Sequence, residues 1–457
     1  MLKRRSTLQG MQIFTVIWFG QFVSALGTGM TRFALLIWAY QQTGDATTLA
    51  LLGFFSFGPY VLLGPIAGVW VDRLDRRLVM LFTDLGAGLM TIAMLVLYTT
   101  GNLQIWHLYI ASGMAGAFEA FQLTAYSAAT TTLAPKAHLA RASGMRSLGT
   151  SAAEVFAPFL AGMMLTLFDI DGVMLIDVAT FLIAMLTLSL VRIPAPTLSE
   201  EGINARGNMR QEITFGFRYI FRRPGLLGLL LIFVGINLFA ALTYFAILPP
   251  MVLARTGGDE LALASVQSAL GIGGVAGGVV LTIRGGPKRQ IHGVLAAASV
   301  SFLLGDFLFA TGRSAPVWVL AAFLAAFFIP FIIGADRAIW QAKVPPDIQG
   351  RVLSVQSTLR TATMPIGYLL AGPLADQVFE PAMAAGGSLA ESFGWLVGTG
   401  PGAGMALMFL CTAILGCAMS LSGYLFRPVR QVENDLPDYD VVPLKTGADP
   451  SLSTPSI

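Results

Sequence analysis

Charged residues are scarce in this sequence. Only 12% of its 457 residues are Asp, Glu, Lys or Arg, whereas 55% are hydrophobic. Soluble domains carry about 25% charged residues, so this composition excludes an ordinary water-soluble enzyme. The mean hydropathy of +0.72 indicates a protein that lies in a lipid bilayer.

Cysteine and histidine are also rare, and their positions exclude two kinds of site. Cys411 and Cys417 fall in one apolar segment and would point to different sides of a helix, which argues against a disulfide between them. The histidines, His107, His138 and His292, are scattered and predict no metal cluster. The sequence also has no G-x-x-x-x-G-K-[ST] motif, which excludes a P-loop ATPase. We expect no metal, no other cofactor and no nucleic-acid partner.

Long apolar segments dominate what is present. A bilayer-spanning helix needs about 20 apolar residues. Twelve such segments occur, at 12–40, 48–71, 78–99, 104–133, 142–167, 172–191, 225–253, 260–283, 291–311, 315–342, 352–379 and 402–426. The first follows a basic head and is too long for the core of a signal peptide, so we expect an uncleaved helix. The sequence predicts an all-α membrane protein with twelve transmembrane helices.

A polar stretch divides these segments six and six. We expect a first six-helix half at 1–191, a linker at 192–224 and a second half at 225–426. Within the linker, Met209 to Arg223 has the pattern of an amphipathic interfacial helix. The polar, proline-containing end at 427–457 has the composition of a disordered tail.

The two halves repeat each other at a constant offset of 210 residues. Matched pairs are Pro135 and Pro345, Arg141 and Arg351, Ser147 and Ser357, Gly162 and Gly372, Gly64 and Gly274, and Gly68 and Gly278. Two homologous six-helix halves joined by a linker are typical of a duplicated transporter.

The basic residues predict how the chain is oriented. If the amino end is inside, the inner segments hold nearly all Lys and Arg residues, and the outer loops hold only Arg255 and Arg313. Positive charge marks the cytoplasmic side. We therefore expect a multi-pass protein of the inner membrane with both termini in the cytoplasm.

A dense group of charges lies between the second and third apolar segments. The stretch "GPIAGVWVDRLDRRLVML" places two acids and three arginines within Asp72 to Arg77. Arginines alone would anchor a cytoplasmic turn. Acids add nothing to such an anchor, so we expect this loop to have a further role.

These residues and the repeat resemble the major facilitator superfamily over all twelve segments. The loop motif of that family, G-x-x-x-D-R/K-x-G-R-K/R, is matched here by Gly68, Asp72, Arg73, Asp75, Arg76 and Arg77, with Asp75 in place of the usual glycine. The phrases "WFGQFVSALGTGMTRFALLIWAYQQTGDATTLALL" and "GTGPGAGMALMF" resemble the branch that contains macrolide-type efflux proteins and siderophore exporters. The resemblance implies a monomer that carries a small molecule across the bilayer.

The resemblance also implies roles for two motifs. In the family, the loop acid and arginines form a charge relay that latches the halves in one state. Exporters of the family often carry G-P-x-x-G-G in helix 5, which is matched here by Pro158 and Gly162, with Gly149 upstream and with alanine in two glycine positions, Ala157 and Ala161. Ordinary tight packing of helices is the alternative for this motif. The arginine that many proton-coupled members carry in helix 4 is absent from "HLYIASGMAGAF", so that route to proton coupling does not carry over.

Four charged residues fall within segments that line the central cavity in this family. They are Arg32, Glu119, Glu154 and Arg360. A charge at the bilayer centre costs about 2.5–3.5 kcal/mol and needs a partner or water. We expect Glu119 and Glu154 to carry an exchanging proton or to meet a cationic substrate, with Arg32 and Arg360 as counter-ions. Static ion pairs that only order the bundle are the alternative.

Other charges in the apolar segments suggest gates or structural roles. Asp84 is about two turns from the charged loop and is a candidate to join the latch. Asp336 and Arg337 are adjacent, face different directions, and are candidates for an inner gate. Asp177 and Asp306 lie in peripheral segments, where we expect a structural role.

The sequence therefore predicts a proton-coupled antiporter that exports an amphiphilic, drug-like or macrolide-like molecule by alternating access. A siderophore or metabolite exporter, or an importer of the same fold, is the alternative within this class. A membrane enzyme or a non-transporting receptor is a further alternative. An enzyme needs convergent nucleophile–base or metal-ligand sets, and the sequence shows none.

Overall fold

The computed structural model describes residues 2–71, 74–135, 138–191, 209–345 and 348–439. The first half consists of six long helices: α1 (Leu2–Thr43), α2 (Ala46–Val71), α3 (Arg76–Thr99), α4 (Ile105–Leu133), α5 (Leu139–Leu165) and α6 (Asp169–Leu190). Their apolar composition and length suit a bilayer, where each helix satisfies its own backbone hydrogen bonds.

The second half repeats this layout with more irregular helices. Its six crossings are α9–η2–α10 (Pro224–Ala240, Ala241–Ile247, Leu248–Thr256), α11 (Glu260–Arg284), α12–η3–α13 (Gln290–Ser301, Phe302–Asp306, Phe307–Thr311), α14–α15 (Ala315–Phe327, Ile329–Lys343), α16–α17–η4–α18 (Gln349–Thr361, Met364–Pro373, Leu374–Phe379, Glu380–Met383) and α20 (Ala403–Leu425). The segments η2, η3 and η4 are π-helical. Short helices α8 (Met209–Phe221), α19 (Ala390–Val397), α21 (Arg427–Arg430) and α22 (Val432–Asp435) connect or follow these crossings.

Ten of the twelve crossings in the described ranges are long and apolar enough to span a membrane by length and composition. The other two are α4 and the α16–α18 crossing. Both carry many polar residues, such as Gln122 and Ser127 on α4 and Gln356 on α16. Polar transmembrane helices need contact with protein or water rather than lipid, so these two helices are candidates to line a polar path.

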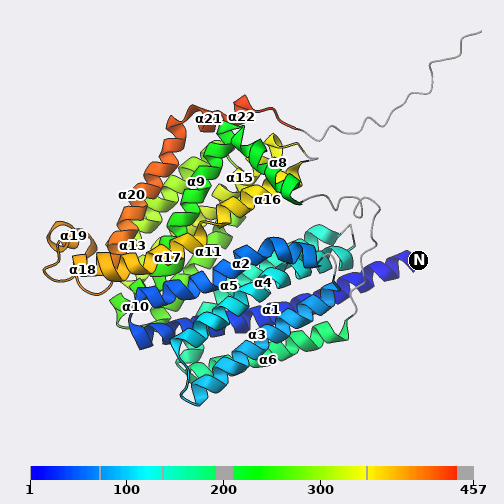
Figure 1. Ribbon diagram of the computed structural model, residues 1–457, viewed down its shortest axis with the longest axis horizontal. Coiled ribbons are helices and arrows are strands. Elements are labelled where there is room, and N and C mark those ends of the chain that lie inside the picture. The colour runs from blue at the N-terminus through cyan, green and yellow to red at the C-terminus, as the bar shows by residue number, and fades with distance from the viewer. Residues whose placement is uncertain (1, 72–73, 136–137, 192–208, 346–347, 440–457) are drawn as a thin grey trace, which may run out of the picture.

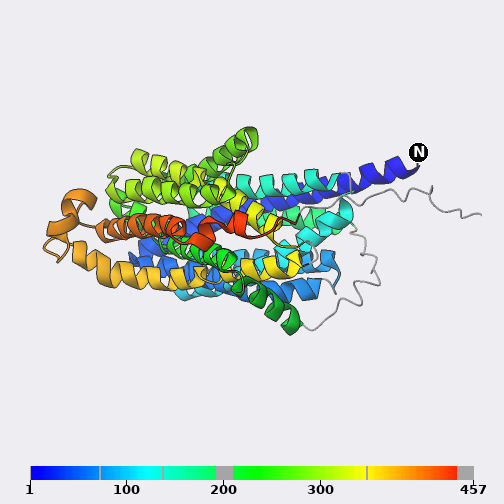
Figure 2. The ribbon, with the colours of Figure 1, turned by 90° about the horizontal axis from the view of Figure 1, so that it is seen from above.

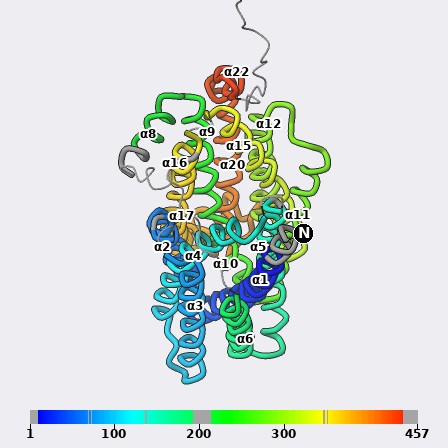
Figure 3. Tube along the Cα trace, turned by 90° about the vertical axis from the view of Figure 1, so that its right-hand side faces the viewer, coloured from blue at the N-terminus to red at the C-terminus, as the bar shows by residue number. Residues whose placement is uncertain are grey.

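The two halves lie side by side (Figure 1), the first below the second in an end-on view (Figure 3). The end that carries the N-terminus and α22 is named the termini face. The other end, where α10 lies and the α19 loop projects (Figure 2), is named the opposite face.

Contacts between the halves lie toward the opposite face. In Figure 3, α2 runs beside α17 and α5 runs beside α11. A Cβ atom added at Gly162 would lie 2.8 Å from Ala264 Cβ, and one at Gly372 would lie 2.4 Å from Thr47 Cα. These two glycines are the repeat-related pair of the sequence. Each is therefore the small residue that lets a helix of one half approach the other half closely.

The end of the described chain differs from expectation. Residues 427–439 are ordered, although their composition predicted disorder. Lys343 is 3% exposed, and its Nζ lies 2.7 Å from Asp438 Oδ1. The Glu433 carboxylate accepts hydrogen bonds of 3.0 Å from the backbone N–H groups of Gln290 and Ile291 at the start of α12. The tail is ordered because it pairs a buried lysine and caps a helix, which its polarity alone did not reveal. Residues 440–457 lie outside the described residues.

Gly372→Ala tests the close contact between the halves. The added methyl group meets the α2 backbone, and such overpacking costs about 1–3 kcal/mol. We expect a lower Tm of the purified protein in detergent. The matched control is Gly64→Ala on α2, where a Cβ atom would meet no heavy atom within 4 Å. Alanine is favoured over glycine in helices by about 0.5–1 kcal/mol, so this variant should keep or raise its Tm. Equal Tm values for the two variants would contradict the role of Gly372.

Candidate functional site

Three charged side chains of the first half lie close together. Arg32 of α1 pairs with Glu119 of α4 at 3.5 Å between Nη2 and Oε2, and their side chains are 60% and 52% exposed. Glu154 of α5 is also exposed and lies within electrostatic range of Glu119. Tyr60 of α2 is a further electrostatic neighbour of Glu119. Arg32 and Glu119 thus join α1 to α4, and Glu154 of α5 and Tyr60 of α2 lie within electrostatic range of this pair.

This polar region lies where the two halves meet. Arg32 is within electrostatic range of the hydroxyl of Tyr368, which belongs to α17 of the second half. Tyr368 packs so closely on Gly53 of α2 that an added Cβ atom would lie 2.2 Å from its ring. The charged group is therefore next to the contact that joins the halves at the opposite face.

The ion pair in this region is weak. Its partners are more than half exposed and 3.5 Å apart, and exposed pairs of this kind contribute about 0–1 kcal/mol. Among the described residues, no basic side chain forms an ion pair with Glu154. Both carboxylates are therefore available to a proton or to a cationic group at little cost in broken contacts.

Arg360 has a different partner from the one expected. Its Nη1 lies 2.9 Å from Oδ2 of Asp336 on α15, within the second half. Asp336 is 1% exposed and also accepts hydrogen bonds from Trp340 at 2.9 Å and Gln356 at 3.3 Å. The prediction that Arg360 serves Glu119 and Glu154 is therefore wrong for this conformation, because an acid one helix away in its own half binds it.

The side chains of Asp336 and Arg337 lie in different surroundings, as predicted for adjacent residues of a helix. Asp336 is buried, whereas Arg337 is exposed. Removing one partner of a buried ion pair costs about 3–5 kcal/mol, so the Asp336–Arg360 pair holds α15 and α16 together. A gating role of these residues stays a prediction.

Asp84 belongs to a network of neutral partners inside the first half. Gln21 of α1 donates to Asp84 Oδ2 at 2.7 Å, and Gln122 of α4 donates to Oδ1 at 2.8 Å. Gln122 also accepts from Thr83. Gln122 also donates to Gln21 Oε1 at 2.8 Å, so the carboxylate on α3 is held by amides of two helices, α1 and α4. Among the described residues, Asp84 binds these amides, whereas Arg76 and Arg77 bind backbone carbonyls.

Two buried acids accept hydrogen bonds from hydroxyl groups. Asp177 accepts from Thr28 at 3.1 Å and from Thr91 at 2.9 Å. Asp306 accepts from Thr412 at 2.6 Å and from Tyr244. Hydrogen bonds of this kind offset the cost of burying a carboxyl group, so both acids bind neighbouring helices together.

The described part of the charged loop binds its own half. Asp75, which stands in place of the usual glycine, caps α3 by accepting a 2.8 Å hydrogen bond from the N–H of Arg77. Arg76 donates to the carbonyl of Ala128 at 2.8 Å, and Arg77 donates to the carbonyl of Leu188 at 3.1 Å. Three helices are thus joined at the termini face. Gly68 lies near the end of α2, and Asp72 and Arg73 lie outside the described residues.

The helix 5 motif packs against two neighbouring helices. A Cβ atom at Gly149 would lie 3.0 Å from Nε1 of Trp18 on α1, and Gly162 faces α11 of the other half. Pro158 lies inside α5 between these contacts. Nearby, Ser268 of α11 donates to the carbonyl of Val155 at 2.9 Å. The motif therefore forms part of the joint between the halves.

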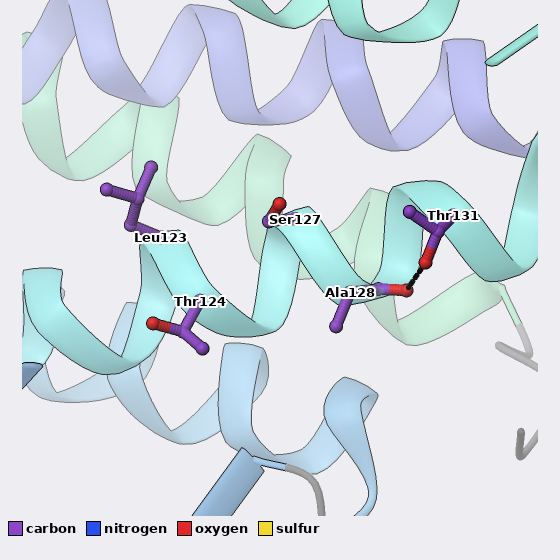
Figure 4. Close-up of a pocket in the computed structure, with 5 residues that line it drawn as sticks. All are labelled: Leu123, Thr124, Ser127, Ala128 and Thr131. Carbon is purple, nitrogen blue, oxygen red and sulfur yellow. Dashed lines mark hydrogen bonds between the residues drawn. The ribbon is translucent and has the colours of Figure 1, made fainter. Parts of the chain in front are cut away.

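A cavity on α4 was not predicted. It measures about 420 Å³ and is lined by Leu123, Thr124, Ser127, Ala128 and Thr131 (Figure 4). It begins one helical turn after Glu119 and continues toward the termini face. The signal in the sequence was the run of hydroxyl residues after Glu119, in a segment read only as apolar.

Asp376 was also missed. It lies at the end of the apolar segment 352–379 and binds the start of α2 in the other half. A single acid at the end of a hydrophobic segment looked like a boundary residue, and only the fold shows its partner.

Two bacterial efflux proteins are similar to this chain in sequence. Macrolide efflux protein A of Streptococcus pyogenes is 26% identical over 369 residues, which cover 80% of this chain and 90% of that protein. The multidrug efflux pump Tap of Mycolicibacterium fortuitum is 23% identical over 371 residues, covering 79% of this chain and 88% of the pump.

Solved structures show the same fold. A bacterial homologue of the human lysosomal transporter Spinster, in an inward-facing and unoccupied conformation, aligns with a TM-score of 0.66 at 16% identity, covering 93% of this chain and 98% of that one. A bacterial homologue of the iron transporter ferroportin in an inward-facing state gives 0.63 at 15% identity, covering 90% and 98%. The family model of the Major Facilitator Superfamily matches residues 17–368. This chain therefore belongs to the Major Facilitator Superfamily of membrane transporters.

Proposed function

We propose that this protein is a proton-coupled antiporter of the bacterial inner membrane that exports an amphiphilic, drug-like or macrolide-like molecule. The observation that carries the proposal is the group formed by Arg32, Glu119 and Glu154 at the junction of the halves. The names of the relatives, macrolide efflux protein A and multidrug efflux pump Tap, support export of this substrate class.

The two carboxylates suit an exchange of proton for substrate. Both are exposed, and the ion pair between Arg32 and Glu119 is weak. A proton on Glu119 or Glu154 removes the negative charge that a cationic group of a substrate would bind. Because proton and substrate compete for one charge, binding of one favours release of the other. Such competition couples proton movement to substrate movement when the proton binds from one side of the membrane and the substrate binds from the other.

The arrangement of the halves suits alternating access. The halves are joined toward the opposite face by α2 with α17 and α5 with α11, and they diverge toward the termini face (Figure 1). We propose that the termini face is cytoplasmic, since it carries most of the Lys and Arg residues. In this orientation the structure is ready to take up a molecule from the cytosol or the inner leaflet.

The cavity on α4 supports the same direction of entry. Its hydroxyl groups follow Glu119 on the side of the termini face. Thr124, Ser127 and Thr131 provide hydroxyl groups beside the apolar Leu123 and Ala128, which suits a molecule with both polar and apolar parts. We propose that this stretch of α4 is the path by which substrate or water reaches Glu119.

Glu119→Gln and Glu154→Gln test the coupling. Each change removes a titratable charge and keeps the size of the side chain. We expect transport of labelled erythromycin or ethidium, driven by an imposed pH gradient in proteoliposomes, to fall about fivefold or more, since coupling free energies are about 1–3 kcal/mol. Exchange without a gradient should persist if only coupling is lost.

The matched control is Glu391→Gln, an exposed acid on α19 outside this region. It should transport like the unaltered protein. The coupling proposal fails if transport of each probe ignores the gradient while both site variants match the control. A siderophore found accumulating in the medium of a producing strain, with neither probe transported, would instead assign the alternative substrate class.

The orientation has its own test. In a chain with Cys411 and Cys417 replaced by alanine, we expect a cysteine at exposed Lys288 to be labelled by an impermeant maleimide only after the cells are opened. A cysteine at exposed Asn102, on the opposite face, should be labelled in intact spheroplasts because that loop faces outward. The reverse pattern would show that the termini face is external.

A further inference from the structure

Asp376 joins the two halves through the start of a helix. It lies in η4 of the second half, and α2 belongs to the first half. Asp376 Oδ1 accepts a hydrogen bond from the N–H of Ala46 at 3.1 Å. Its Oδ2 accepts from the N–H of Thr47 at 2.7 Å and from the Thr47 hydroxyl at 2.5 Å. One carboxylate therefore binds three donors of the other half.

These donors need a partner from elsewhere. The first N–H groups of a helix have no acceptor within the helix, and the helix dipole makes this end attractive to a negative charge. The first turn of α2 contains no acidic residue. The carboxylate that satisfies the N–H groups of Ala46 and Thr47 comes from the second half, so α2 is capped in this way only while the halves are together.

The local packing brings Asp376 to this position. Gly372, one turn earlier, is the glycine whose added Cβ atom would lie 2.4 Å from Thr47 Cα. The backbone then enters the π-helical segment η4, which contains Asp376. π-Helical turns often occur at functional sites because they change the direction of the side chains that follow. Close approach and altered helical phase together place the carboxylate over the end of α2.

We propose that the Asp376 cap on α2 is a latch that holds the halves together at the opposite face and sets the balance between the two access states. Opening that face must separate η4 from α2 and break all three hydrogen bonds. The charged loop at 72–77 follows the other end of the same helix. The proposal does not depend on the substrate or on proton coupling, since it concerns the conformational balance of the empty transporter.

The same face provides a matched control. Asp259 caps α11 by accepting a 3.0 Å hydrogen bond from the N–H of Ala262, and both residues belong to the second half. Removing this cap weakens a helix start by a similar amount, but the hydrogen bond that is lost lies within the second half and does not cross between the halves. Asp259→Ala should therefore lower stability but leave the balance between access states unchanged.

Spin-label distances measure that balance directly. One label pair is placed across the halves at the opposite face, at Asn102 and Ser388, and another at the termini face, at His138 and Gln341, in the chain without Cys411 and Cys417. The protein carries no substrate, and the pH is held constant. Asp376→Ala should raise the ratio of the state open at the opposite face to the state seen here by about threefold to tenfold, the effect expected from losing a helix cap.

Two further variants keep the test decisive. Asp376→Asn keeps the size and part of the capping ability, so it should give a smaller shift. Thr47→Val removes one of the three hydrogen bonds and should also shift the balance in the same direction. The proposal is overturned if Asp376→Ala leaves both distance distributions unchanged, or if Asp259→Ala shifts them as much. Because no gradient is applied, loss of proton coupling in the Glu119 variant would leave this result unaffected.

Discussion

The structure depends on how closely the helices of one half approach those of the other. Gly162 and Gly372 allow this approach at two repeat-related places, against Ala264 and Thr47. A larger side chain at either place would meet a neighbour closer than van der Waals distance, and lipid provides no hydrophobic force that would drive the helices together again. The contacts near these glycines, including those of Asp376 and Ser268, form only because the backbones are already close.

The acidic residues of the transmembrane helices fall into two groups, which differ in how the free-energy cost of placing a charge in the bilayer is offset. Asp177, Asp306 and Asp336 are almost fully buried, and each has several hydrogen-bond partners within its own half. Glu119 and Glu154 are exposed and have few partners. A buried charge is tolerated when its partners are fixed, whereas a charge with few partners needs water or a ligand. The second group is therefore the one that we propose for binding and release.

The sequence predicted the elements well and the partners poorly. Hydrophobic length and the 210-residue repeat were enough to place the helices, since lipid requires each crossing to be long and apolar. The role of Asp75 as a helix cap, the pairing of Arg360 with Asp336 and the order of residues 427–439 depend on contacts between distant segments. Residue type and position on one helix do not determine which neighbouring helix faces a side chain, so these contacts could not be derived from the sequence.

The π-helical segments are found in one of the two halves. Among the described residues, the π-helical segments η2, η3 and η4 all belong to the second half. The segment η2 packs against α2 and α17, and Tyr244 of η2 donates to Asp306 of η3. The first-half partner of η2 and η4 is α2, which is a continuous α-helix despite its two prolines. π-Helical turns are rare inside α-helices and occur frequently at functional sites. On the α2 side of the contact between the halves, a regular helix of the first half thus packs against two π-helical segments of the second half, η2 and η4.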